Sequence, residues 1–238
     1  MLELKNISFQ AEDEKEILKD VSLKIDDKIV VITGPNGGGK STLAKVIAGI
    51  VTPTGGQILL DGEDITGYSV TERANAGISL AFQQPVRFKG LTVRDLITIA
   101  AGKELNVSEA CSYLSEVGLC AKDYIDRELN ASLSGGEIKR IEIATILARG
   151  SKFSIFDEPE AGIDLWSFQS LIRVFEKMQK EYKGTILIIS HQERILDIAD
   201  KIIYIKDGMV KQYGPKDEIL KTLINAAQPG CDVLMQKI

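Results

Sequence analysis

Residues 29–48, IVVITGPNGGGKSTLAKVIA, decide the fold of this chain. They open with an apolar, β-branched run over 29–32, which is typical of a buried parallel strand. They close with apolar residues at the spacing of one helix face. Between the two, Gly34–Ser41 has the pattern G-x-x-x-x-G-K-[ST] of a phosphate-binding loop. A strand, this loop and a helix in succession predict a nucleotide phosphate site.

The chemistry of this loop follows from its glycines, which can take backbone angles that residues with a Cβ avoid. The chain can then wrap a phosphate with its amides pointing inward, while the next helix directs its free N–H groups at the same anion. We expect Lys40 to reach the β- and γ-phosphates and Ser41 to ligate Mg²⁺. A glycine-rich turn that matches by chance is the alternative. The predicted phosphate-binding residues are Gly34, Pro35, Asn36, Gly37, Gly38, Gly39, Lys40, Ser41 and Thr42.

The composition sets limits on the class of protein. The chain has 238 residues, 44% of them hydrophobic, which is enough for one domain or a domain with an inserted lobe. A net charge of -5 and the lack of a long Lys/Arg block argue against nucleic-acid binding. No apolar run is long enough to span a membrane, and the first residues lack the apolar core of a signal peptide. We therefore expect a cytoplasmic protein without direct membrane insertion.

The three cysteines, Cys111, Cys120 and Cys231, have no C-x-x-C spacing. Small buried hydrophobes or ordinary surface thiols are favoured over a metal or redox role.

The chain before residue 86 combines strands with turns. Residues 1–28 alternate apolar runs with polar turns and show no long helical period, so we predict a small antiparallel sheet there. The other elements predicted in this part are strands over 57–60 and 77–82, a turn over 61–64 and a short helix over 70–75.

Residues 86–149 differ in character and contain no proline, and we predict an inserted helical lobe there. Thr92-x-x-Asp95 resembles a capping box at the start of a helix. A second helix is predicted to open at Ser108 and Glu109, and a third to cover 134–148.

The rest of the chain returns to alternating strands and helices, which implies a mostly parallel sheet with right-handed crossovers. We expect one α/β domain over 1–238, with its core in 1–85 and 150–238. The predicted elements are strands over 152–156 and 185–190, a helix over 165–182, a strand pair over 202–205 and 209–213 that turns at Asp207-Gly208, and a last helix from Pro215 that fades near Pro229-Gly230.

The segment Phe153–Glu158, FSIFDE, is an apolar strand that ends in two carboxylates, Asp157 and Glu158. Open α/β sheets place ligands at the carboxyl ends of their strands. We expect Asp157 to hold Mg²⁺ directly or through water. Glu158 is the expected general base for a water that attacks the γ-phosphate. A solvated acidic turn before Pro159 is the alternative.

Three polar segments add to these carboxylates. Leu133–Glu137, LSGGE, is by itself an ordinary loop in which Ser134 caps a helix. Gln83 directly follows a strand, where a neutral amide can ligate Mg²⁺ or orient water, and Gln84 is the competing choice. His191 is the only histidine and follows another apolar strand, although a lone histidine is more often structural than catalytic.

Together these segments resemble the ATP-binding cassette (ABC) ATPases over essentially the whole chain. The resemblance implies a P-loop fold with ATP and Mg²⁺ as cofactors, and hydrolysis of ATP to ADP and phosphate. The loop at Gly34–Ser41 corresponds to the Walker A motif, and Gln83 to the glutamine of the Q-loop. His191 falls at the switch-histidine position, where it would contact the γ-phosphate and support Glu158.

The resemblance also implies a second copy of the chain. LSGGE is the family signature, in which Ser134, Gly135 and Gly136 would bind the γ-phosphate held by the opposite subunit. Asp164 matches the D-loop aspartate that crosses between subunits. The sequence departs from the family pattern at the residue that contacts adenine. Many members carry an aromatic that stacks on adenine near residue 11, where this chain has Ala11, with Phe9 two positions earlier.

The residues around these motifs are similar to those of the SufC-type ATPase of iron-sulfur cluster assembly. Asp157–Leu165, DEPEAGIDL, differs from the more usual DEPTSALD form, and Ala81–Val86, AFQQPV, lacks the usual importer form. The resemblance implies a SufB/SufD-like scaffold partner that binds the helical lobe and Q-loop and changes shape on ATP binding. The alternatives are the nucleotide-binding subunit of a membrane importer and a regulatory ATP-binding protein. The presence of Glu158 and His191 disfavours the regulatory reading.

Overall fold

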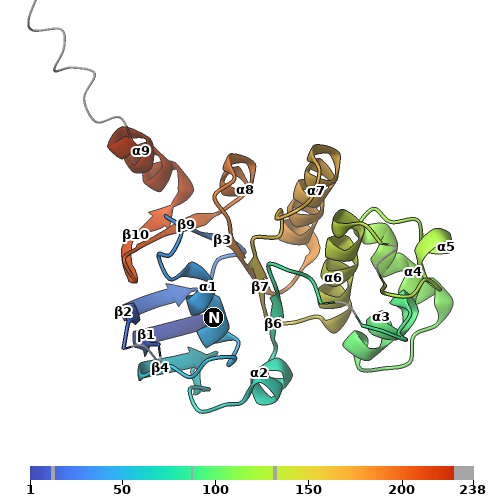
Figure 1. The fold of residues 1–238 in the computed structure, drawn as a ribbon, viewed down its shortest axis with the longest axis horizontal. Helices are drawn as coiled ribbons and strands as arrows, with labels where there is room; N and C mark the ends of the chain where they lie inside the picture. Colours follow the sequence, from blue (N-terminus) through green and yellow to red (C-terminus); the bar gives the residue numbers. More distant parts are fainter. Residues whose placement is uncertain (12–13, 87, 131–132, 228–238) are drawn as a thin grey trace, which may run out of the picture.

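The computed structural model describes residues 1–11, 14–86, 88–130 and 133–227, with side chains up to residue 223 (Figure 1). A six-stranded sheet forms the centre, in the order β10-β9-β3-β8-β7-β6. Its strands are β3 (Ile29–Thr33), β6 (Ile78–Ala81), β7 (Phe153–Asp157), β8 (Thr185–Ile189), β9 (Lys201–Lys206) and β10 (Met209–Pro215).

Five of these strands are parallel, which confirms the predicted α/β sheet. The strands β3 and β7 are buried along their whole length, as expected for strands covered on both faces. Only β10 is antiparallel, and it pairs with β9 through a turn in which Asp207 and Gly208 both have positive φ. The turn predicted at Asp207-Gly208 is therefore confirmed.

A second, antiparallel sheet has the order β2-β1-β4-β5 and comes mainly from the start of the chain. The antiparallel pair predicted over residues 1–28 is present, and β4 and β5 widen it. The turn predicted over 61–64 is wrong in part, because its last two residues pair with β4 as an edge strand. The strands are β1 (Leu2–Gln10), β2 (Glu16–Ile25), β4 (Gly55–Leu60) and β5 (Glu63–Asp64).

The helices lie around these sheets (Figure 1). The capping box predicted at Thr92 is confirmed, since the Thr92 side chain accepts the N–H of Asp95. The next helix begins earlier than predicted, because Asn106 rather than Ser108 caps it and forms a box with Glu109. The helices are α1 (Lys40–Ile47), α2 (Val70–Ala76), α3 (Val93–Ala101), α4 (Val107–Glu116), α5 (Ala121–Tyr124), α6 (Gly135–Arg149), α7 (Leu165–Glu181), α8 (Glu193–Asp197) and α9 (Lys216–Ala227).

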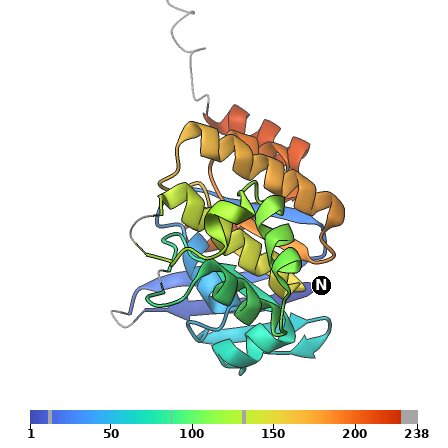
Figure 2. The same cartoon turned by 90° about the vertical axis from the view of Figure 1, so that its right-hand side faces the viewer.

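Two hydrophobic clusters pack on opposite faces of the central sheet. One joins β1, β2, β4 and α1 to the sheet. The other joins the sheet to α6 and α7, and includes an edge-on contact between the rings of Phe156 and Phe175 with centroids 5.1 Å apart. The helices α3, α4 and α6 pack together at one end of the molecule, on the right in Figure 1 and facing the viewer in Figure 2. These helices fall within residues 86–149, which we propose as the inserted lobe.

Further predictions concern the cysteines, the end of the last helix and membrane-spanning segments. Cys111 and Cys120 are free thiols, the first half-buried and the second exposed, while Cys231 and the predicted helix end near Pro229-Gly230 lie outside the described residues. Within the described part of the chain, no helix combines the length and the apolar character needed to cross a membrane.

Candidate nucleotide-binding and hydrolysis site

The phosphate-binding loop lies between β3 and α1, pressed against the neighbouring strand β9. Gly34 has a φ of 141°, and a Cβ there would stand 1.9 Å from the carbonyl oxygen of Ile205. Glycine is therefore required at this position. The Gly208 N–H also donates to the Gly38 carbonyl at 3.2 Å, so the β9–β10 turn braces the loop from the side.

Lys40 is the first residue of α1 and is only 6% exposed. Its Nζ donates to the carbonyl oxygens of Gly34, at 2.8 Å, and Pro35, at 2.9 Å, so the ammonium lies inside the loop. Burial lowers the pKa of Lys40, and the nearby Glu158 and Asp157 carboxylates oppose that shift. The side chain is thus held where a phosphate wrapped by the loop would meet a positive charge.

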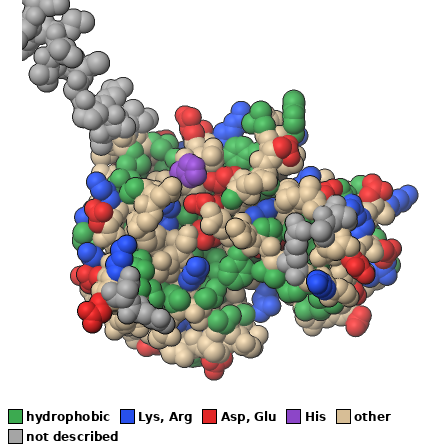
Figure 3. Space-filling model, in the orientation of Figure 1, with side chains coloured by type: hydrophobic (Ala, Val, Ile, Leu, Met, Phe, Trp, Pro, Cys, Tyr) green, Lys and Arg blue, Asp and Glu red, His purple; other side chains and the backbone are tan. Residues whose placement is uncertain are grey.

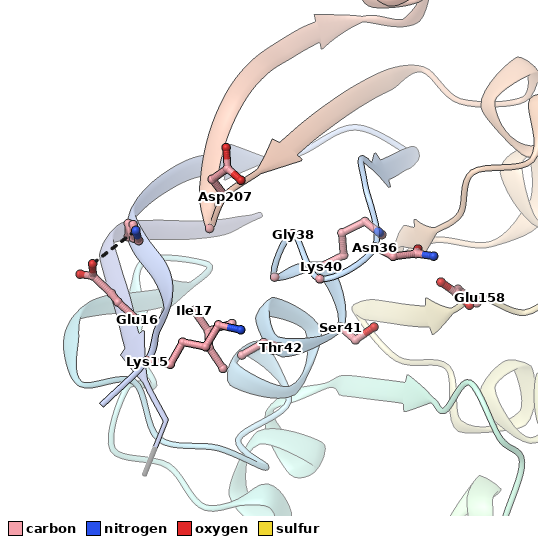
Figure 4. Close-up of a pocket in the computed structure, with 14 residues that line it drawn as sticks. Lys15, Glu16, Ile17, Asn36, Gly38, Lys40, Ser41, Thr42, Glu158 and Asp207 are labelled. Carbon is pink, nitrogen blue, oxygen red and sulfur yellow. Dashed lines mark ion pairs between the residues drawn. The ribbon is translucent and has the colours of Figure 1, made fainter. Parts of the chain in front are cut away.

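A cavity of about 620 Å³ opens in front of the loop. Figure 4 shows Glu158 at one end of it, with Lys15, just before β2, and Ile17, near the start of that strand, at the other. Asp207 projects from the β9–β10 turn above. The volume is typical of a small-molecule site. No aromatic side chain is among the described residues that line it, in line with Ala11 at the position where the family often has an aromatic.

Two oxygen donors suited to Mg²⁺ meet at the base of the loop. The Ser41 hydroxyl donates to Asp157 Oδ1 at 3.0 Å. Burial raises the pKa of Asp157, Glu158 adds to the rise, and the Ser41 hydrogen bond opposes it. Mg²⁺ prefers hard oxygen ligands and keeps several waters and phosphate oxygens, so two protein oxygens fit it. The described residues hold no cluster of three or more His, Cys, Asp or Glu that would suit a different metal.

Glu158 stands directly beyond β7 in a left-handed conformation, with φ 45°. A residue with a Cβ adopts this conformation at a cost of about 1 kcal/mol. Its N–H donates to the Ile189 carbonyl at 3.0 Å, and its Oε2 accepts a hydrogen bond from Gln83 Nε2 at 2.5 Å. The backbone turn and the Gln83 amide together direct this carboxylate into the cavity.

His191 follows β8, next to β7, so it lies at the same edge of the sheet as Asp157 and Glu158. Its side chain is exposed, and Figure 3 shows the chain's one histidine on the surface. Ser190 before it is buried, and its Oγ donates to Glu160 and accepts the N–H of Gln192. Burial raises the pKa of Glu160, and His191 opposes that rise.

The signature residues lie elsewhere in the chain. Ser134 caps α6 in a box with Glu137, whose Oε1 accepts the hydroxyl of Tyr124. A Cβ on Gly135 would stand 3.1 Å from the Gly162 carbonyl, and one on Gly136 would stand 3.0 Å from Ser167 Oγ. These glycines therefore contact the segment before α7 and the first turn of α7 itself. No residue of Leu133–Glu137 is among the described residues that line the cavity.

Asp164 caps α7, and its carboxylate accepts the N–H groups of Trp166 and Ser167, at 2.9 and 3.0 Å. These bonds hold the pKa of Asp164 below its usual value, with Ser167 as the main cause. One chain thus brings Lys40, Ser41, Gln83, Asp157, Glu158 and His191 to one edge of the sheet, while Ser134, Gly135, Gly136 and Asp164 form a separate group.

No sequence motif identifies Lys139, Glu142 or Glu160 as part of the site. Lys139 and Glu142 are three residues apart on α6, among apolar residues that point inward, and that pattern is the signal that could have revealed a buried pair. At the far end of the cavity, no sequence motif marks Lys15 or Ile17 as part of a site, and Asp207 is marked only as a turn residue.

Comparison with known proteins identifies the family. Residues 18–161 match the sequence family described as ABC transporter. The uncharacterized ABC transporter ATP-binding protein MJ0035 of Methanocaldococcus jannaschii is 39% identical, with 86% of this chain and 85% of the relative covered. The probable ATP-dependent transporter ycf16 of Pyropia yezoensis is 35% identical, covering 90% and 91%. The spermidine/putrescine import ATP-binding protein PotA of Mesoplasma florum is 31% identical, with 92% of this chain and 63% of the relative covered.

Solved structures give the same fold. A dimeric structure of MJ0796, a bacterial ABC transporter cassette, superposes with a TM-score of 0.81 at 26% identity, covering 91% of this chain and 99% of that one. The ADP conformation of the cassette MJ1267 gives 0.80 at 27% identity, covering 94% of each. The chain belongs to the ABC transporter family, has the α/β fold of its ATP-binding cassettes, and is an ATPase that uses ATP and Mg²⁺.

Proposed function

We propose that this chain is the ATP-hydrolysing subunit of a Suf-type iron-sulfur cluster assembly machine. The observation that carries the proposal is the segment Asp157–Leu165, DEPEAGIDL, which places Glu160 where the DEPTSALD form has threonine. Glu160 is half-buried and bound to Ser190, next to His191. Glu160 therefore links the segment after β7, which carries Glu158, to the segment after β8, which carries His191.

In the proposed hydrolysis, Ser41 and Asp157 would hold Mg²⁺, which would supply charge neutralisation at the phosphates. Lys40 exchanges its contacts with the loop carbonyls for the β- and γ-phosphate oxygens. Glu158 accepts a proton from the water that attacks the γ-phosphate. Gln83 holds the Glu158 carboxylate in place, and His191 contacts the γ-phosphate from the neighbouring strand.

We further propose that the site closes only when two copies meet on ATP binding. Ser134, Gly135 and Gly136 stand at the positive end of α6, a ready anion site, but contact their own α7 region rather than their own cavity. A second copy would present this group to the phosphates. Trp166, 78% exposed and two residues after Asp164, lies beside the same group and fits an interface.

A groove of about 310 Å³ between α2, β6, α3 and α6 offers a surface for a partner. Figure 3 shows the surface hollowed between the main body and the helices at its right. The groove exposes Ile99, 62% accessible, together with Val70 and Phe82. Phe82 precedes Gln83, so a scaffold seated here would lie next to the Q-loop, and we propose a SufB/SufD-like protein as the occupant.

The experiment is capture of the partner with a groove variant and a matched control. Ile99→Asp places a charge in the groove, whereas Val107→Asp places one at a similarly exposed position on α4 outside it. We expect Ile99→Asp to lose the co-expressed scaffold in a pull-down, with Val107→Asp retaining it and both keeping ATP binding. Equal capture by the two variants would place the partner elsewhere.

A membrane importer subunit is the second candidate, favoured by the 31% identical PotA, which is described as an import protein. The same groove could receive a cytoplasmic helix of a permease. A pull-down that recovers only a polytopic membrane protein would decide for the importer and against the Suf-type role. A scaffold gene beside this one would favour the Suf-type role, and a permease gene the importer.

A further inference from the structure

The peptide groups of Phe82 lie just past the end of β6 and are held by a single helix. The ladder between β6 and β7 ends at the pair Ala81 and Phe156, so the next residue lies outside the β-ladder. Its N–H donates to Glu142 Oε1 at 3.2 Å, and its carbonyl accepts a hydrogen bond from Lys139 Nζ. We call Lys139 and Glu142 the α6 clamp.

The clamp is ionic, with Lys139 buried and Glu142 partly buried. Lys139 is 2% exposed, and its Nζ lies 3.4 Å from Glu142 Oε2. Burial raises the pKa of Glu142, and Lys139 opposes the rise. Replacing such a pair by apolar residues is often neutral or stabilising, so stability alone does not account for it. Its geometric effect is to fix one peptide of the Q-loop to one turn of α6.

That peptide directly precedes the residue that touches the general base. Gln83 Nε2 donates to Glu158 Oε2 at 2.5 Å, so three links connect α6 to the Glu158 carboxylate. We propose that Lys139 and Glu142 are positioning residues for ATP hydrolysis: by clamping Phe82, they set Gln83 against Glu158. The inference rests on the role proposed for Gln83. Because Ser134–Gly136 open the same helix, a shift of the signature end of α6 also moves the clamp.

The test is a double-mutant cycle on the full-length chain, with kcat, the Kd for ATP and the melting temperature measured for each variant. Lys139→Met removes the ammonium at similar length. We expect kcat to fall by about 10- to 100-fold, as for other small misplacements in active sites, with the Kd for ATP unchanged because the cavity lining is intact. In the Gln83→Ala background the same substitution should lower kcat by less than about twofold.

A control and a second variant keep the test decisive. Lys28 Nζ also donates to a backbone carbonyl, that of Tyr182 at 2.5 Å, away from the site, so Lys28→Met should leave kcat unchanged. If Lys139→Met does not fold, Glu142→Ala enters the same cycle. Glu142→Gln, which keeps an oxygen for the Phe82 N–H, should recover part of the loss.

The possible failures are distinct. If Lys139→Met lowers kcat by the same factor with and without Gln83, the clamp does not act through Gln83 and the inference is overturned. A kcat for Lys139→Met within about twofold of that of the unmodified protein would also overturn the inference. If Gln83→Ala itself leaves kcat unchanged, the role proposed for Gln83 fails, and the clamp inference falls with it.

Discussion

Arg73 is a buried cation whose guanidinium binds only backbone carbonyls, and its replacement gives a sharp test of how the start of the fold is held together. It is 1% exposed, and two of its four acceptors belong to the last turn of α1, the helix that begins in the phosphate-binding loop. The acceptors are the carbonyl oxygens of Val46 at 2.6 Å, Ile47 at 2.9 Å, Thr66 at 2.8 Å and Tyr68 at 3.2 Å.

For Arg73→Met we expect a loss of about 4 kcal/mol in the free energy of unfolding. Each of the four hydrogen bonds contributes about 1 kcal/mol net. The value is no larger because Arg73→Met also removes the cost of burying the guanidinium. The same burial lowers the pKa of Arg73. At about 2–4 °C per kcal/mol for a chain of this size, the melting temperature should fall by roughly 8–16 °C.

The measurement is urea denaturation followed by circular dichroism, with calorimetry for the melting temperature. Arg149→Met is the matched control, since Arg149 is exposed and donates one bond, of 2.8 Å, to the Ala74 carbonyl. It should cost about 1 kcal/mol or less. A loss below about 1 kcal/mol for Arg73→Met would show that the carbonyls find other partners and would refute the reasoning.

Four further results are expected. Glu158→Gln should lower hydrolysis by at least about 100-fold and make an ATP-bound dimer visible by light scattering, and an unchanged turnover rate would remove Glu158 from its role. Ser134→Arg should block that dimer while sparing ATP binding, and normal ATPase activity in it would count against closure by two copies. Trp166 is the only tryptophan, so its fluorescence should shift to the blue when ATP is added to the Glu158→Gln protein, and a constant spectrum would place it outside the interface. Ala11→Tyr should tighten ATP binding by about 2- to 10-fold in a titration if a ring there reaches adenine, and an unchanged Kd would put the base elsewhere.

Local patterns in the sequence predict most of the secondary structure. The strand predicted over 152–156 is observed at Phe153–Asp157, and the helix predicted over 165–182 at Leu165–Glu181. The helices α5 and α8, with four and five residues, are too short to show a helical period, which is why they were not predicted. The start of α4 was misplaced because Asn106 and Ser108 are both good caps, and only the position of Glu109 decides between them.

The candidate site was predictable in its residues but not in its contacts. Glycine, lysine and carboxylate spacing located the groups around Lys40 and Asp157. The contacts of Phe82 with α6 join segments about 60 residues apart, and no local pattern reports such a pairing. The same holds for Glu160 and Ser190, which are adjacent only because β7 and β8 are neighbours in the sheet.

The place of β3 in the sheet also bears on how the protein is made. Its neighbours β8 and β9 follow it by about 150 residues or more, and Gly34 is braced by Ile205. At a synthesis rate of about 5–20 residues per second, roughly 8–34 seconds pass before the ribosome delivers these neighbours. During that interval the β-branched strand Ile29–Thr33 is an unpaired, aggregation-prone segment. The phosphate-binding loop is therefore braced only after β9 has been synthesised, and a nucleotide bound to it would stabilise a late step of folding.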